Sequence, residues 1–164
     1  MFNLRIAKII LVLLPALQMF QIALTNAFNF SGVLRETGFV LGMTGTPEVL
    51  KGMLWRATDN PVMVYGGSFF IVGTEFLTAF LLAVGAYQMW KARALDKAVF
   101  NKSKKFVIWG CLAGIILFYG GFLTIAGNWF FVWTTPTAGA LETAYRYATL
   151  LLLIMIFIAE TNHD

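Results

Sequence analysis

The chain has 164 residues, of which 59% are hydrophobic and only 12% are charged, with a formal net charge of +4. A soluble domain carries about 25% charged residues, so this chain has too few polar groups to cover a surface that faces water. The composition excludes an ordinary soluble enzyme, a disordered chain and a soluble nucleic-acid-binding domain, and it predicts a membrane protein.

Four stretches of the sequence are apolar enough to cross a membrane as helices. Crossing about 30 Å of hydrocarbon takes roughly 20 residues, and suitable stretches lie at about 6–25, 62–89, 106–128 and 141–159. Polar and apolar residues do not alternate, and the runs are too long for strands. We therefore expect an all-α membrane protein with one membrane domain over residues 1–164 and four transmembrane helices.

The first stretch has an alternative interpretation as a signal peptide, because Arg5 and Lys8 precede its apolar run. Thr25 to Ala27 form a weak cleavage site, and the run is long enough to span the membrane. We expect a retained helix.

Residues 26–60 form the only sizeable segment outside the membrane on their side. A loop of this length without structure is unusual. Thr46 to Glu48 are typical of a helix start, with an N-cap, a proline and an acid in the first turn. They predict an interfacial helix at about 47–57 with Trp55 in the headgroup region, and Asn60 before a proline starts the second span. This helix is a connector, a lid or a docking surface, and we favour the connector.

The basic residues gather on one side of the predicted membrane. Two precede the first helix and six lie in the link at 90–105, so this side holds eight of the twelve. Segment 26–60 balances three basic residues with three acidic ones. By the positive-inside rule both termini are cytoplasmic. The link has few aromatic residues to stack on bases, so we expect no nucleic-acid partner.

Glu75 lies near the middle of the second predicted helix, where a bare carboxylate costs a few kcal/mol or more. Ser68 and Thr78 share its helical face, and Gln18 and Gln21 form a polar stripe on the first helix. We expect these two stripes to face each other and to form an intramembrane polar site.

Glu75 has two interpretations. It is either a carboxylate coupled to proton or cation movement, or a structural group that hydrogen-bonds to the glutamines and fixes helix packing. We favour the structural role, because no second acid lies nearby. Arg146 has Glu142 four residues before it, the better orientation for an ion pair. A pair between Glu75 and Arg146 is the alternative.

Other chemical signatures are few. The chain has no serine, histidine and aspartate triad, no histidine pair, no phosphate loop and no paired cysteines, and we expect no catalytic residue, no cofactor and no metal. The tail at 160–164 could ligate a metal weakly, but a solvated helix end is the favoured interpretation. Gly110 and Gly114 indicate close helix contact, and Cys111 between them is expected to be a packing residue.

Several groups of residues resemble a known family when they are taken in order. They are Gly42, Met43 and Pro47, Leu54 to Ala57, Glu75 with Leu77 to Ala79, Gly85 and Ala86, Gly121 and Phe122, and Trp129, Phe130 and Trp133. Together they resemble a bacterial family of predicted small integral membrane proteins, domain of unknown function 2165, over nearly the whole chain. The resemblance implies four membrane helices and makes Glu75, Trp55 and Arg56 family positions. It implies no activity. We expect the protein to lie in a bacterial inner membrane.

The chain departs from this family pattern in its second half. Asn128 stands where the family tends to have an acidic residue, and Thr134 and Thr135 replace a glutamine and serine pair. The later run of asparagine, glycine and glutamine is absent. If those residues form an outer polar site in relatives, that site is in doubt here.

These observations lead to three functional hypotheses. The first is a non-enzymatic accessory or structural subunit that packs, within the lipid bilayer, against a larger membrane complex. The alternative is a small transporter or lipid-binding protein that uses the polar site around Glu75. A third is a lipid-modifying enzyme built on Glu75, Arg56 and Asn128. The candidate site on the outer face consists of Trp55, Arg56, Asn128, Trp129 and Arg146.

Overall fold

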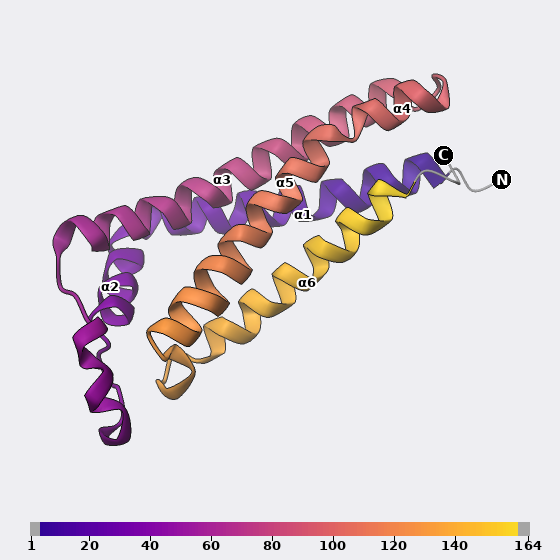
Figure 1. The fold of residues 1–164 in the computed structure, drawn as a ribbon. Helices are drawn as coiled ribbons and strands as arrows, with labels where there is room; N and C mark the ends of the chain where they lie inside the picture. The colour runs from indigo at the N-terminus through magenta and orange to yellow at the C-terminus, as the bar shows by residue number, and fades with distance from the viewer. Residues whose placement is uncertain (1–3, 161–164) are drawn as a thin grey trace.

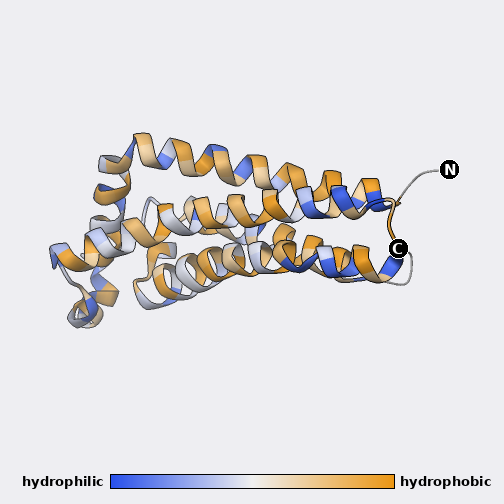
Figure 2. Ribbon diagram, turned by 90° about the horizontal axis from the view of Figure 1, so that it is seen from above, coloured by the Kyte–Doolittle hydropathy of each residue, from blue (hydrophilic) through white to orange (hydrophobic). Residues whose placement is uncertain are grey.

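The computed structural model describes residues 4–160, and within them the chain is helical with no strand. Four stretches are long and apolar enough to cross a membrane: α1 (Leu4–Phe28), α3 (Pro61–Ala92), the stretch Lys97–Trp129 and α6 (Gly139–Ala159). Figure 2 shows hydrophobic residues along these helices and hydrophilic residues concentrated toward the two ends. The predicted all-α fold with four membrane-spanning helices is confirmed.

The helices form one bundle with two different ends. α1 and α3 run side by side, α5 (Lys105–Ile115) packs against α3 and passes over α1 in this view, and the chain returns along α6, which packs against α5 (Figure 1). The start of α1, the end of α6 and the short helix α4 (Lys97–Ser103) lie at one end, which we call the basic end. The opposite, loop end carries α2 (Phe30–Leu41), η1 (Glu48–Arg56) and η3 (Val132–Thr134).

The segment at 26–60 holds two helices where we expected one. η1 is a 3₁₀ helix close to the predicted range of 47–57. α2 was not predicted, and it packs along the first turns of α3. The Ser68 hydroxyl donates to Thr37 Oγ1 at 3.0 Å, and the rings of Phe30 and Phe69 are 4.8 Å apart. α2 therefore shields one side of α3 beyond the end of α1.

The predicted start of the second span at Asn60 is confirmed, whereas the predicted N-cap at Thr46 is not. Asn60 Oδ1 accepts a hydrogen bond from the Val62 amide at 2.9 Å, and α3 begins at the following proline. The prediction of Thr46 as N-cap is wrong, because its hydroxyl donates to the Met43 carbonyl at 2.6 Å. Met43 and Gly45 adopt positive φ angles of 49° and 84°, so the hydroxyl is used in this tight turn instead of the helix start.

The third span differs from the single helix predicted at 106–128. Residues 97–103 of the predicted link form α4, and α5 continues into η2 (Ile116–Trp129), a π-helix. The Thr124 hydroxyl accordingly bonds to the carbonyl of Tyr119, five residues earlier. Long π-helices are rare. Adjacent glycines at 120 and 121 lower the cost of this wider backbone.

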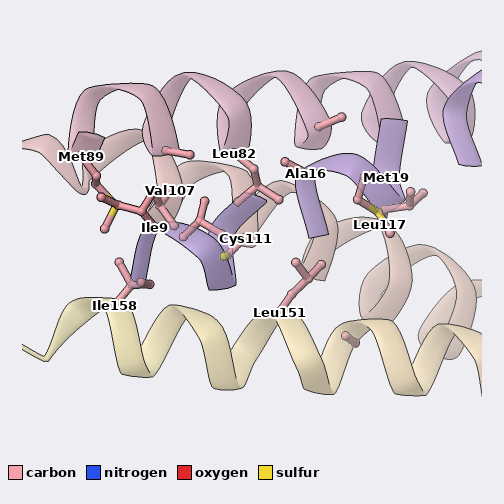
Figure 3. Packing of buried hydrophobic residues seen from close by; sticks show 14 of the residues in the cluster. Ile9, Ala16, Met19, Leu82, Met89, Val107, Cys111, Leu117, Leu151 and Ile158 are labelled. Atoms are coloured by element: carbon pink, nitrogen blue, oxygen red, sulfur yellow. The ribbon is translucent and has the colours of Figure 1, made fainter. Parts of the chain in front are cut away.

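The core is built where α3 and α5 cross. Figure 3 shows the side chains of Leu82, Val107 and Cys111 between the helices, and all three are fully buried. A Cβ on Gly110 would lie 3.0 Å from the Leu82 amide nitrogen. Glycine therefore sets the distance between these two helices, and Cys111 is a packing residue, as predicted.

The Gly85 contact gives a test of this packing. A Cβ on Gly85 would lie 2.7 Å from the backbone nitrogen of Val107, so the helices must move apart in Gly85→Ala. We expect unfolding to become easier by about 1–3 kcal/mol, measured as a lower melting temperature in mild detergent. Gly73→Ala on the same helix meets nothing within 4 Å and should leave the melting temperature unchanged or raised. Equal melting temperatures for the two variants would contradict the proposed contact.

Candidate functional site

Glu75 is buried in the bundle and bound by one side chain. Its residue is 2% exposed, and Asn26 Nδ2 lies 2.8 Å from one carboxylate oxygen and 3.0 Å from the other. Asn26 belongs to the last turn of α1, whereas Glu75 lies near the middle of α3. The pair therefore joins the end of α1 to α3, between residues 49 positions apart.

The predicted glutamine partners of Glu75 are wrong. Gln18 and Gln21 lie on the exposed face of α1, and the carboxylate is bound by Asn26 instead. The sequence holds a signal for Asn26 that we missed. Met19 and Ala23 are buried on α1, and Asn26 follows them at the same helical spacing of four and three residues. The signal was hidden because we ended the helix at Thr25.

The polar residues on the buried face of α3 do not form one site. Ser68 bonds to Thr37 of α2, and Glu75 bonds to Asn26 of α1. Thr78 Oγ1 is buried and has no hydrogen-bond partner among the described residues, and its side chain packs near Gly114 of α5. This stripe thus contacts three different helices in turn, an arrangement that suits helix packing better than substrate binding.

At the loop end, the aromatic rings of three residues surround Arg56. Its guanidinium carbon lies 4.5 Å from the ring centre of Trp129 and 5.2 Å from those of Trp55 and Phe131. Arg56 Nη1 also donates to the Trp129 carbonyl at 3.2 Å. The two tryptophan rings meet edge to face at 5.9 Å. We call Arg56 and these three rings the arginine clamp, and it joins η1 to the end of η2.

Sequence reasoning missed Phe131. Its φ of 54° is unusual for a bulky residue, and no local sequence pattern predicts it. The strained backbone at the turn after η2 accompanies a ring that lies over Arg56. A strained residue persists where the surrounding structure holds it in place, and the contact with Arg56 is one that Phe131 makes here.

The other two residues of the predicted outer site lie outside the arginine clamp. Asn128 is exposed. Arg146 forms the expected ion pair with Glu142, and both side chains are 68% exposed. The alternative pair between Glu75 and Arg146 is not formed. The structure therefore brings together Trp55, Arg56 and Trp129 of the five predicted residues.

The basic end contains buried cations that sequence reasoning treated only as topology signals. Lys8 is 1% exposed and Lys104 is 4% exposed. Their ammonium groups lie 2.6 Å and 3.1 Å from the Glu160 carbonyl oxygen at the end of α6. The last carbonyls of a helix lack partners within the helix and attract positive charge. These lysines therefore tie α1 and the third span to the end of α6.

No group of three or more metal-binding side chains lies together in the part of the chain that the structure describes. Most of the tail with the weak metal-binding interpretation, residues 161–164, lies outside the described residues. The surface has a groove between α1 and α6 and a depression at the basic end. Glu75 lines neither of them.

The Asn26–Glu75 pair predicts a coupled effect of mutations. Asn26→Ala leaves the buried carboxyl group without its partner and should destabilise the protein by about 1–3 kcal/mol. Thr25→Ala, at the neighbouring exposed position, should change stability by less than about 0.5 kcal/mol. In a double-mutant cycle with Glu75→Leu, we expect a coupling energy of at least about 0.5 kcal/mol between Asn26 and Glu75. Additive melting-temperature changes would show that the pair contributes nothing.

Comparison with known proteins agrees with the membrane fold. No curated protein and no solved structure matches this chain. A family model described as predicted small integral membrane protein matches residues 4–161, and this range includes all four spans and the Asn26–Glu75 pair. The resemblance inferred from the sequence is confirmed, and the chain belongs to the DUF2165 family of predicted small integral membrane proteins.

Proposed function

We propose that this protein is a non-enzymatic accessory subunit that binds a helix of another integral membrane protein through α1. The observation that carries the proposal is the exposure of Gln18 and Gln21 on a membrane-spanning helix. Gln18 lies ten residues after Lys8, about 15 Å along the helix, which is close to the middle of the bilayer. An amide in contact with lipid there has no hydrogen-bond partner, whereas polar side chains commonly bond across helix interfaces.

The spacing of the exposed residues supports helix binding. Leu11, Leu14, Gln18, Gln21 and Thr25 follow one another at intervals of three, four, three and four residues, and all are exposed. This is the repeat with which one helix packs its side chains between those of another. We call these five residues the α1 seam.

The α1 seam borders a groove that can take part of a helix. The groove lies between α1 and α6 and has a volume of about 390 Å³. Its lining is apolar except for Gln18 and the Tyr147 hydroxyl, with Leu11, Leu14, Pro15, Met19, Leu150, Leu151 and Ile154 completing it. The occupant that fits is a transmembrane helix with a polar side chain at the depth of Gln18, because an amide both donates and accepts hydrogen bonds.

Support for a structural role of Glu75 comes from its burial and its bond to Asn26. The transporter hypothesis has no comparable support, since neither depression described here reaches Glu75. The lipid-modifying hypothesis required Glu75, Arg56 and Asn128 around one cleft. Arg56 instead lies within the arginine clamp, and Glu75 has a separate partner.

Partner binding is tested by removing the amides. The double variant Gln18→Leu with Gln21→Leu keeps the α1 seam apolar but removes its hydrogen bonds, which are each worth about 1–2 kcal/mol between membrane helices. After purification from native membranes in mild detergent, the wild type should retain a stoichiometric integral membrane partner. The double variant should retain at least about tenfold less, measured by quantitative mass spectrometry.

Gln88→Leu is the matched control, because it makes the same chemical change on α3 and should not affect retention. Three outcomes would contradict the proposal: a wild type that purifies without a partner, a wild type that retains only further copies of itself, or equal losses in all variants.

We further propose that the protein lies in a bacterial inner membrane with its basic end in the cytoplasm and with η1 at the outer interface. The positive-inside rule supports this orientation. A cysteine placed at Val49 on η1, which is 86% exposed, should react with a membrane-impermeant maleimide in cells whose outer membrane is permeabilised. A cysteine at Lys97 should react only after the inner membrane is opened. The reverse labelling pattern would overturn the orientation. Nucleic acid plays no part in this proposal.

A further inference from the structure

A depression lies at the basic end between the junction of α4 with α5 and the end of α6. Its volume is about 420 Å³. Three of its six lining residues are lysines and none is acidic; the lining consists of Asn101, Lys102, Lys104, Lys105, Ile108 and Ala159. A concave surface with this charge attracts an anion.

The three lysines of the depression lie at and around the junction between α4 and α5. α4 ends at Ser103 and α5 begins at Lys105, so Lys104 stands at the junction. Lys104 is largely buried and bonds to the Glu160 carbonyl, whereas Lys102 and Lys105 are exposed. The rim of the depression thus carries two accessible ammonium groups, and a third ammonium group is held in the wall.

The rest of the lining is suited to the other parts of a phospholipid. Ile108 and Ala159 provide an apolar side for an acyl chain. Trp109, one helical turn after Lys105, is exposed. Exposed tryptophan marks the headgroup level of a membrane, and the depression lies at this level.

We infer that this depression binds an anionic phospholipid, such as phosphatidylglycerol. Lys102 and Lys105 contact the phosphate, and an acyl chain lies along Ile108. Basic pockets between membrane helices bind anionic headgroups by this chemistry. The site is separate from the α1 seam, so it does not rest on the accessory role proposed above.

The inference is tested with the full chain in detergent and dioleoyl phosphatidylglycerol as the probe. Native mass spectrometry should show the lipid retained by the wild type, with dioleoyl phosphatidylcholine retained much less. In Lys102→Gln with Lys105→Gln, the affinity for phosphatidylglycerol should fall about tenfold or more. Ala159→Phe, which fills the depression without changing charge, should cause a similar loss.

The matched control is Lys91→Gln with Lys97→Gln, which removes two exposed lysines at the same end outside the depression. This control should bind phosphatidylglycerol like the wild type. Equal losses in both double variants would overturn the inference, because they would show attraction to the whole basic end. Equal retention of the two lipids would overturn it as well. Inorganic phosphate that raises the melting temperature as much as the lipid would identify a site for free phosphate instead.

Discussion

The fold depends on one constraint of the membrane interior, which is that a buried carboxyl group is costly there unless it has a hydrogen-bond partner. Glu75 meets this constraint through Asn26, and the pair fixes the last turn of α1 against the middle of α3. α1 then ends, and α2 turns to cover the next part of α3 through Thr37 and Phe30. A carboxyl group whose position first suggests transport thus marks the place on α3 where packing against α1 ends and packing against α2 begins.

Each end of the bundle is stabilised by cationic side chains, and the two ends use different kinds of cation. At the loop end, Arg56 lies among three aromatic rings and bonds to one carbonyl, a use for which its flat guanidinium is suited. At the basic end, Lys8 and Lys104 point their compact ammonium groups at the Glu160 carbonyl, directly after α6. Between these ends, glycine contacts bring α3 and α5 together. The glutamines of the α1 seam take part in none of these contacts.

Much of the fold could be predicted from the sequence, and the failures have physical causes. The four spans, the start of the second span after Asn60 and the Glu142–Arg146 pair follow from local composition and spacing. The partner of Glu75 depends on where α1 ends, a boundary that hydropathy alone defines poorly. α2 escaped prediction because its residues are only partly buried. The arginine clamp includes Phe131, whose positive φ no local sequence pattern predicts. Of the five residues predicted for the outer site, only Trp55, Arg56 and Trp129 come together.

The burial of Lys8 and Lys104 has a consequence for how the sequence can change over evolutionary time. A topology signal depends only on the number of basic residues on one side, so for orientation alone an exposed lysine can move along the link or be exchanged for arginine. Lys8 and Lys104 also point their ammonium groups at the Glu160 carbonyl, a contact that a planar guanidinium makes with a different geometry. Of the basic residues that orient the chain, these two are therefore constrained by position as well as by charge, as is Arg5, which donates to the carbonyls of Arg93 and Leu95.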